Sequence, residues 1–204
     1  MGVGMSEILP GLYVGNVCDA RDKEALRSHK VTHIVTIHDH AKGQLENMTY
    51  LMLHSQDNPT ANISQHFSEA VHFIHKCRTQ ENCCLVHCIA GVSRSVTITV
   101  AYLMSVTDYN WRDCLRAVKQ ARKVAKPNYG FQKQLQEFEN SGLEQVRASV
   151  RATYPADALR ERDTAAIRDL LQKYNQSSEA GRAEEDLYPL PINAFRDNLG
   201  PPVP

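Results

Sequence analysis

Residues 87–95, His-Cys-Ile-Ala-Gly-Val-Ser-Arg-Ser, constrain the fold of this chain more than any other segment. The apolar run 83–86 before them predicts a buried strand, and the apolar run 96–106 after them predicts a helix. A strand that passes through a tight loop into a helix is typical of an anion-binding cradle, because the loop N–H groups and the positive end of the helix dipole point at one spot. The sequence therefore predicts an α/β fold with such a cradle at the carboxyl end of a strand.

Strand-like and helix-like segments alternate along the first 140 residues. Apolar β-branched stretches predict strands, and apolar residues three and four positions apart predict helices, one of which begins at Asn62 or Ser64. This alternation indicates a central, mostly parallel sheet flanked by helices on both faces. The predicted strands lie in 7–15, 31–37, 50–53 and 83–88, and the predicted helices in 18–29, 67–74, 96–106, 111–125 and 129–140.

The composition changes after Pro155. Residues 163–174 fit one amphipathic helix, whereas 175–204 are rich in Ser, Pro, Asn and charged residues, which favours disorder. We therefore divide the chain into a domain at 1–154 and a tail at 155–204 that is first helical and then disordered.

The composition also limits the partners to be expected. The chain is 42% hydrophobic and 23% charged, with a formal net charge of zero, so we expect no nucleic-acid partner. No apolar run reaches the roughly 18 residues of a membrane span, and we expect no signal peptide. The six cysteines lack zinc or disulfide spacing. We therefore expect no metal, no other cofactor and a reducing, intracellular compartment.

Cys88 and Arg94 bring chemistry to the predicted cradle. A free thiol has a pKa of about 8.5, and a helix N-terminus and a nearby Arg lower it into the range of roughly 3.5–7.5. Such a thiolate can attack phosphorus and form a phosphocysteine. Arg94 can bind two phosphoryl oxygens with its planar fork, and a cation at a helix start is otherwise unfavourable. Both residues therefore predict covalent removal of a phosphoryl group.

Two further residues of the segment have open roles. Ser95 can cap the helix, or it can donate a hydrogen bond to the Cys88 thiolate as the sulfur departs. His87 is interpreted as a residue that orients the loop through hydrogen bonds.

The leaving oxygen needs a proton donor on a loop near the strand ends. Asp57 follows the strand-like segment 50–53 and precedes Asn58-Pro59, a turn signal. Asp39 is the rival candidate on the residues alone. A general acid of this kind contributes roughly 10²–10⁴-fold to the rate.

At this point a family resemblance can be stated. HCIAGVSRS matches the His-Cys-x5-Arg-Ser signature of the cysteine-dependent protein tyrosine phosphatases. Residues 1–154 resemble the small atypical dual-specificity phosphatases, most of all their myristoylated, Jun-kinase-stimulatory branch. The segments MGVGMSEILPGLYVGN, THIVTIHD, the Asp57 loop and KPNYGFQKQLQEFE carry the resemblance. His54-Ser55-Gln56 and Cys83-Cys84 are local departures from it. The resemblance implies a protein tyrosine phosphatase-like fold.

The resemblance also implies roles for individual residues. It makes Cys88 the nucleophile, Arg94 the phosphate-binding arginine, Ser95 the hydroxyl of the second step and Asp57 the general acid, and it makes Asn128 a support of the loop. The implied phosphate-binding residues are Ile89, Ala90, Gly91, Val92, Ser93 and Arg94. The implied substrates are proteins that carry phosphotyrosine and phosphoserine or phosphothreonine, with kinases of mitogen- or stress-activated pathways among the candidate partners.

Gly2 with Ser6 fits the N-myristoylation pattern Met-Gly-x-x-x-Ser. One myristoyl chain binds membranes only marginally, and no polybasic segment lies beside it in the sequence, so contact should be reversible. We expect a monomer in the cytoplasm, partly at the inner face of the plasma membrane.

Two other functions compete with a protein phosphatase. One is a catalytically weak module that binds phosphoresidues, although Cys88, Arg94 and Asp57 are all present. The other is a phosphatase for RNA 5′-phosphates or lipids, which the neutral charge and the absence of Lys from the loop disfavour.

Overall fold

A computed structural model describes residues 4–41, 45–155 and 159–177 of the chain. Gly2 and residues 178–204 of the segment 175–204 that we predicted to be disordered lie outside these described residues. The prediction was wrong for residues 175 and 176, which continue a helix. The helix predicted at 163–174 is present within a longer one, while the division of the chain at 154 stays a prediction.

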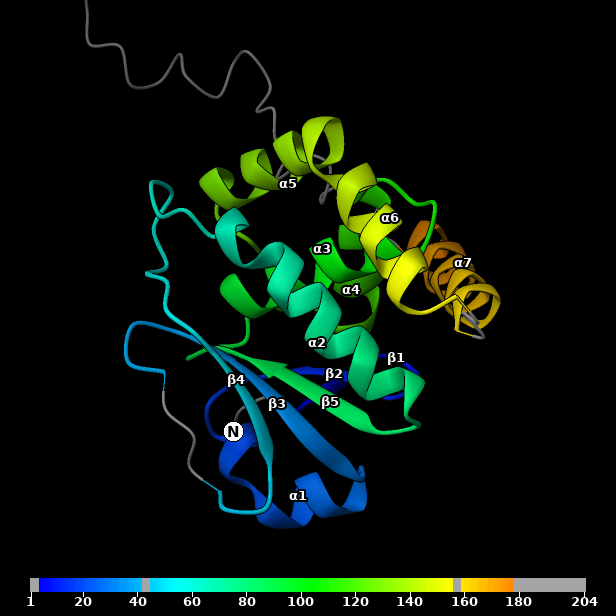
Figure 1. Ribbon diagram of the computed structural model, residues 1–204. Coiled ribbons are helices and arrows are strands. Elements are labelled where there is room, and N and C mark those ends of the chain that lie inside the picture. The colour runs from blue at the N-terminus through cyan, green and yellow to red at the C-terminus, as the bar shows by residue number, and fades with distance from the viewer. Residues whose placement is uncertain (1–3, 42–44, 156–158, 178–204) are drawn as a thin grey trace, which may run out of the picture.

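A five-stranded sheet forms the centre of the molecule (Figure 1). Its strands are β1 (Ser6–Leu9), β2 (Leu12–Gly15), β3 (Val31–Ile37), β4 (Thr49–Leu53) and β5 (Cys83–His87), in the order β1-β2-β5-β3-β4. β1 runs antiparallel to β2, and the other neighbours are parallel. The predicted mostly parallel sheet is therefore confirmed, with β5 at its centre.

The helices cover the two faces unequally. The 3-10 helix η1 (Asp19–Arg21) and α1 (Lys23–Ser28) lie on one face, and the remaining helices of the domain lie on the other (Figure 1). Those helices are η2 (Ser64–His66), α2 (Phe67–Thr79), α3 (Arg94–Val106), α4 (Trp111–Ala121), α5 (Tyr129–Ser141) and α6 (Leu143–Thr153). The prediction of helices on both faces is confirmed.

Helix α3 is the hub of the larger core. All 13 of its residues are buried, because α2, α4, α5, α6 and the sheet surround it. Its hydroxyl groups stay satisfied in this apolar setting by bonding back along the helix: Thr97 donates to Ser93 O and Thr99 to Ser95 O, each at 2.9 Å. Helix α3 directly follows the loop 88–93 and packs against the surrounding core. It therefore gives that loop a rigid support.

Several predicted boundaries were wrong for local reasons. The segment 18–29 forms two short helices because the Asp22 carboxylate accepts the N–H groups of Glu24 and Ala25 and starts a new helix. Asn62 bonds the N–H of Gln65 one turn before α2, so neither Asn62 nor Ser64 caps α2 itself. Helix α4 ends at Ala121 rather than 125, and α6 was not predicted at all.

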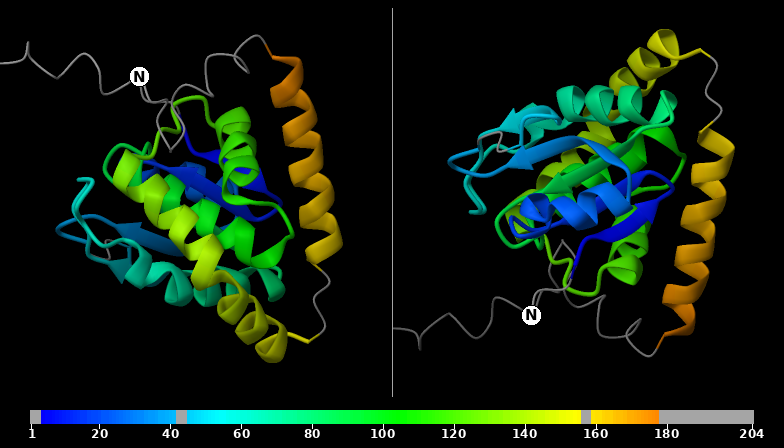
Figure 2. Two further views of the ribbon diagram at one scale, coloured as in Figure 1. Left: turned by 90° about the horizontal axis from the view of Figure 1, so that it is seen from above. Right: turned by 90° about the horizontal axis from the view of Figure 1, so that it is seen from below.

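Helix α7 (Arg160–Gln176) lies along one side of the molecule (Figure 2) and packs against α4 and β1. Ile167 joins the main core, and Tyr174 is buried. A buried ion pair fastens the start of the helix: both Nη atoms of Arg78 on α2 reach the Asp163 carboxylate, at 2.6 and 2.7 Å.

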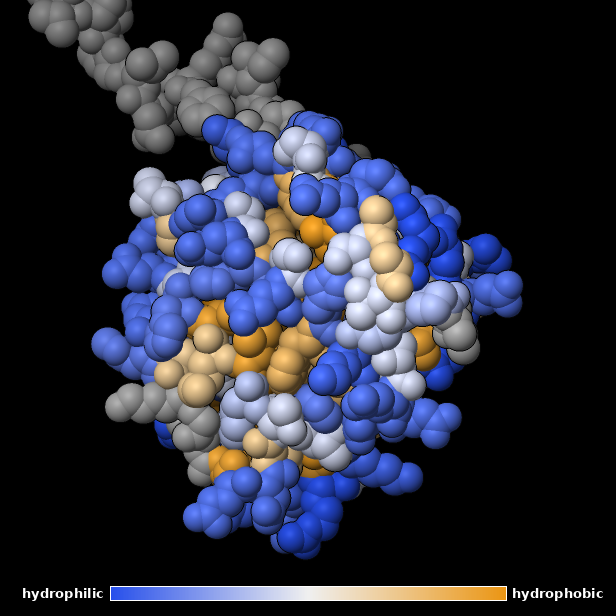
Figure 3. All heavy atoms as spheres, viewed as in Figure 1, coloured by the Kyte–Doolittle hydropathy of each residue, from blue (hydrophilic) through white to orange (hydrophobic). Residues whose placement is uncertain are grey.

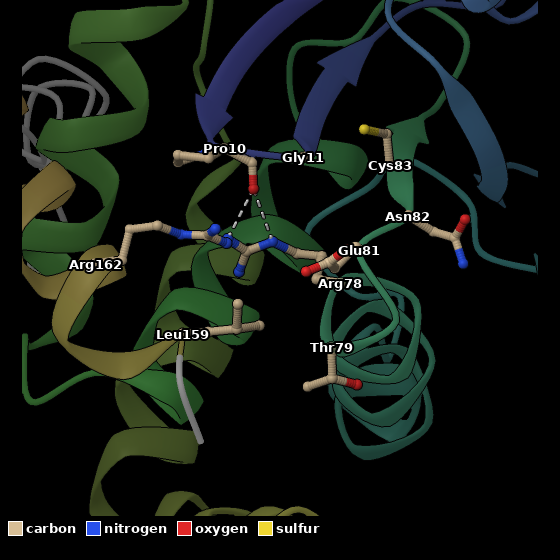
Figure 4. A pocket seen from close by; sticks show the side chains of 9 residues that line it. All are labelled: Pro10, Gly11, Arg78, Thr79, Glu81, Asn82, Cys83, Leu159 and Arg162. Atoms are coloured by element: carbon tan, nitrogen blue, oxygen red, sulfur yellow. Dashed lines mark hydrogen bonds between the residues drawn. The ribbon is translucent and has the colours of Figure 1, made fainter. Parts of the chain in front are cut away.

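A cavity of about 400 Å³ lies between the start of α7 and the β1–β2 turn (Figure 4). Arg78 lines it, but all five of its N–H groups already have partners in Pro10 O, Tyr102 Oη and Asp163. The arginine therefore serves the fold and offers no donor to a ligand there.

The face drawn in Figure 3 is mostly hydrophilic, with apolar atoms gathered beside α2 toward the β4 side of the sheet. β4 is an edge strand, and its Met52 side chain is 48% exposed. Among the described residues, no helix has the length and apolar character required to cross a membrane.

Candidate active site

The loop 88–93 joins β5 to α3 at the carboxyl end of the central strand, as predicted. Its carbonyl groups are held from outside the loop: Val17 N donates to Ile89 O at 3.2 Å, Arg122 Nε to Gly91 O at 2.7 Å and Lys126 N to Val92 O at 2.8 Å. Because the C=O and N–H of a peptide unit point in opposite directions, these contacts turn the N–H groups of the loop inward. The result is a concave ring of donors, a geometry that binds anions.

Gly91 occupies the tightest position of the loop. Its φ of 69° lies in the left-handed region, which residues with a Cβ rarely adopt. A Cβ at this position would also lie 2.5 Å from Gly15 O and 2.6 Å from Arg122 Nη2. Only glycine fits here without moving the loop.

Cys88 lies at the base of the ring, with only 1% of its surface exposed. Its Sγ accepts the N–H of Gly91 at 3.2 Å and lies 3.3 Å from Ser95 Oγ. Burial alone would raise the pKa of the thiol, but hydrogen bonds from the Ser95 hydroxyl and from the N–H groups of Ser95, Gly91 and Val92 outweigh it, so the pKa is lowered. The geometry thus favours the thiolate that the sequence predicted.

Two roles were predicted for Ser95, and the role as a helix cap is wrong. Helix α3 begins at Arg94, two residues earlier than a Ser95 cap requires, and its N-cap residue Ser93 makes no side-chain cap bond. The Ser95 side chain turns instead toward Cys88 Sγ. This contact matches the alternative role, donation of a hydrogen bond to the sulfur.

Arg94 is buried beside the loop and is held by two neighbouring segments. Its Nη1 donates to Asp39 Oδ1 at 2.9 Å and to Ser55 O at 3.0 Å. Its Nε lies 3.6 Å from Asp57 Oδ2 and makes no hydrogen bond with the described residues. A buried guanidinium with an unused N–H beside a ring of amide donors is well suited to bind an anion.

Both candidate acids reach Arg94, but they differ in their other contacts. Asp57 Oδ1 also accepts the Ser93 hydroxyl at 2.7 Å and Asn128 Nδ2 at 2.9 Å. Asp39 makes no such contact with the loop 88–93 among the described residues. Asp57 is therefore the carboxylate that the structure joins directly to the loop 88–93.

Asn128 links two elements at once. Its Oδ1 accepts the N–H of Phe131 and caps α5, while its Nδ2 holds Asp57. Its backbone N–H donates to Ser93 Oγ at 3.3 Å. The predicted support of the loop thus lies where it contacts both the loop and the candidate acid.

His87 lies beneath the loop and is nearly fully buried. Its Nε2 pairs with Thr36 Oγ1 at 2.8 Å and its Nδ1 with Cys88 O at 3.2 Å, a geometry that fits the predicted orienting role. Burial lowers the pKa of His87 to about 4, opposed by the bond to Cys88 O and assisted by His38 and Arg21. The ring is therefore neutral at pH 7.

The rim of the ring is open. Ile89 and Ala90 are exposed, with Ile89 at 48%, whereas Gly91, Ser93 and Arg94 are buried.

Arg122, which donates to Gly91 O, could not be predicted as a site residue from the sequence, because a lone Arg at a helix end carries no motif. Among the described residues, no group of three His, Cys, Asp or Glu side chains could hold a metal ion.

Comparison with known proteins gives independent evidence on the family of this chain. The family model for the dual specificity phosphatase catalytic domain matches residues 12–141. Mouse dual specificity protein phosphatase 22 is 52% identical over 165 residues, which cover 81% of this chain and 90% of that protein. Rat dual specificity protein phosphatase 15 is 43% identical over 177 residues, 86% of this chain and 75% of that protein. A crystal structure of DUSP15 has 45% identity and a TM-score of 0.72, and covers 74% of this chain and 97% of that one.

Proposed function

The chain belongs to the dual-specificity protein phosphatases, and from this premise we propose how its own residues perform the reaction. It hydrolyses phosphotyrosine and phosphoserine or phosphothreonine residues of proteins through a phosphocysteine intermediate. The observation that carries the assignment of residues is the position of Cys88 Sγ, with a lowered pKa, at the base of a ring of N–H groups beside Arg94.

In the first step, the Cys88 thiolate attacks phosphorus. The S–P bond forms as the bond from phosphorus to the substrate oxygen breaks, and Asp57 donates its proton to that oxygen. Arg94 binds two phosphoryl oxygens, and the N–H groups of the loop stabilise the charge on the transferring group. Asn128 and Ser93 hold Asp57 over the ring.

In the second step, water attacks the phosphocysteine and the S–P bond breaks. Asp57, now ionised, accepts a proton from the water. Ser95 donates a hydrogen bond to the departing sulfur, from a hydroxyl that lies 3.3 Å from Sγ. Phosphate and the resting thiolate result.

From the family resemblance we also propose the partners, the oligomeric state and the location of the protein in the cell. Kinases of mitogen- or stress-activated pathways are proposed partners, and the enzyme acts as a monomer. Gly2 carries a myristoyl group that brings a cytoplasmic protein reversibly to the inner face of the plasma membrane. Labelling cells with a myristate analogue tests this: an unlabelled wild-type protein, or an equally labelled Gly2→Ala variant, would exclude it.

Replacement of the nucleophile tests the mechanism. Cys88→Ser should abolish phosphate release from an aryl phosphate, because a serine hydroxyl is far less ionised than the thiol, while binding of a phosphopeptide is retained. Arg94→Lys should lose both binding and rate, because the planar fork is gone. Substantial turnover by Cys88→Ser would remove Cys88 as the nucleophile, and no turnover by the wild type would leave only a binding module.

A further inference from the structure

Arg122 is a buried charge that neither catalytic step uses. Only 1% of its surface is exposed, and its Nε donates to Gly91 O at 2.7 Å. Its Nη1 donates to Gly4 O at 3.0 Å and to Ser6 Oγ at 3.2 Å. One guanidinium therefore joins the phosphate-binding loop to the segment that leads into β1, although these segments are distant in sequence.

The backbone around Arg122 is anchored on both sides. Its N–H bonds to Val118 O as helix α4 ends, and its carbonyl accepts the N–H of Ala125 at 2.9 Å. The next residue, Lys126, donates its N–H to Val92 O. The side chain is thus delivered from a fixed point and passes beneath the loop.

The contact with Gly91 O has a direct consequence for the nucleophile. Gly91 O and Val92 N–H belong to one peptide unit and point in opposite directions. When Arg122 binds Gly91 O from below, the Val92 N–H is directed into the ring, where it bonds the Cys88 sulfur. Loss of the guanidinium would leave a buried carbonyl without its charged donor and free this peptide unit to rotate.

We propose that Arg122 is the positioning residue of the phosphate-binding loop, and that the segment from Gly4 to Ser6 holds its guanidinium in place. The proposal rests on the phosphatase mechanism above. In this proposal, the residues that lead into β1 hold the Arg122 side chain. Arg122 in turn orients the N–H groups of the loop 88–93, and it does not contact the substrate.

The positive charge of Arg122 stabilises the Cys88 thiolate, as its hydrogen bond to Gly91 O does. Burial lowers the pKa of Arg122, whereas the carboxylate of Asp19 on η1 and the Cys88 thiolate raise it. These two groups face the guanidinium from the elements packed against it. A positive charge so close to Cys88 favours the thiolate, so its removal should move the protonation of Cys88 to higher pH.

The test compares four full-length variants: Arg122→Met, Arg122→Lys, Ser6→Ala and, as the matched control, Lys123→Met. Lys123 is exposed and directly follows Arg122, so it controls for the loss of one charge at this helix end. Each variant is measured for kcat and KM on an aryl phosphate, for the acidic limb of the pH profile, and for inhibition by tungstate as an oxyanion probe.

Arg122→Met should lower kcat/KM by about 100-fold, the cost of a misplacement near 1 Å, with weaker tungstate inhibition and an acidic limb shifted to higher pH. Arg122→Lys should recover part of each loss, because an ammonium reaches Gly91 O but cannot also reach Gly4 and Ser6. Ser6→Ala should lower kcat/KM by about 5-fold. Lys123→Met should match the wild type.

Wild-type tungstate inhibition and an unshifted acidic limb in Arg122→Met would overturn the proposal. If that variant does not fold, the same two results in Arg122→Lys and Ser6→Ala would overturn it. An inactive wild type would be a different result, since it would refute the phosphatase mechanism itself.

Discussion

Two carboxylates contact the guanidinium of Arg94, so the identity of the general acid depends on what else each one touches. Asp39 is about half exposed and contacts Arg94 at 2.9 Å. Asp57 is held in addition by Ser93 and Asn128, which fix one of its oxygens beside the ring of N–H groups. A proton donor must be fixed relative to the leaving oxygen, and this condition favours Asp57.

Asp57→Asn should therefore slow phosphothreonine and alkyl phosphates by about 10²–10⁴-fold, because these leaving groups need a proton. An aryl phosphate with an acidic phenol should be slowed much less. The fall in rate on the basic side of the pH profile should flatten, while the fall on the acidic side, which reports Cys88, should remain. Equal slowing of every substrate with both limbs intact would transfer the role to Asp39, and Asp39→Asn is the matched comparison.

The neutral state of His87 makes stability depend on pH. The pKa of His87 is about 4 in the folded chain, against an ordinary value of 6.5. Between these values the unfolded chain binds the extra proton, so stability is fully present above pH 6.5 and is lost as the pH falls toward 4. The loss amounts to about 3 kcal/mol.

Denaturant unfolding at several pH values measures this dependence. His87→Gln should reduce the slope of stability against pH between 6.5 and 4 relative to the wild type, because the difference isolates His87 from the other histidines. Parallel slopes for the two proteins would show that folding does not change the pKa of His87, contrary to this prediction.

At the scale of elements, the start of α5 fixes the loop that carries Asp57. Gly130 packs so closely against this loop that a Cβ would overlap the carbonyl of Pro59. Gln134 on the same helix holds the next stretch, since its amide accepts the N–H of Ile63 and Ser64 and donates to Ala61 O. Helix α5 thus positions the acid loop, which is the loop that carries Asp57. Strand β5 and helix α3 position the loop 88–93, which carries the nucleophile.

Gly130→Ala should consequently resemble Asp57→Asn. It should slow substrates with poor leaving groups most, because it pushes the acid loop away, while inhibition by tungstate stays near the wild-type value. Kinetics on a good and a poor leaving group, with tungstate inhibition, separate the two loops. A Gly130→Ala enzyme that loses tungstate affinity as strongly as rate would show that the loops are not placed independently.

For the whole molecule, helix α7 is joined to the domain by a buried ion pair. The side chains of Arg78 and Asp163 are 1% and 0% exposed. Arg78 also donates to Pro10 O (Figure 4) and to Tyr102 Oη. The family model ends at residue 141, well before this helix. Removing one partner of such a pair leaves a buried charge without compensation.

Asp163→Asn should accordingly lower the free energy of unfolding by about 3–5 kcal/mol. The control is Asp169→Asn on the same helix, whose exposed pair with Lys173 should contribute at most about 1 kcal/mol. Denaturant unfolding of the full chain measures both. Equal stabilities for the two variants would contradict a structural role for the buried pair.

Those features of this protein that depend on neighbouring residues could be predicted from the amino-acid sequence. The strand, loop and helix around Cys88 follow from hydrophobic pattern and from Gly91, and Cys88, Arg94 and Ser95 lie within eight residues of chain. The mostly parallel sheet follows from the alternation of strands and helices. Asp57 was chosen over Asp39 by family resemblance rather than by any local pattern.

Contacts between side chains that are distant in sequence could not be predicted in this way, because they depend on the folded arrangement. Asp57 and Asn128 are 71 positions apart, Gly91 and Arg122 are 31 apart, and Arg78 and Asp163 are 85 apart. Each contact forms because the strand order and helix packing bring separate segments to one point, and no local periodicity encodes that meeting. The Ser95 side chain points at the sulfur for the same reason, since the packing of α3 against the sheet, not capping preference, sets where the helix begins.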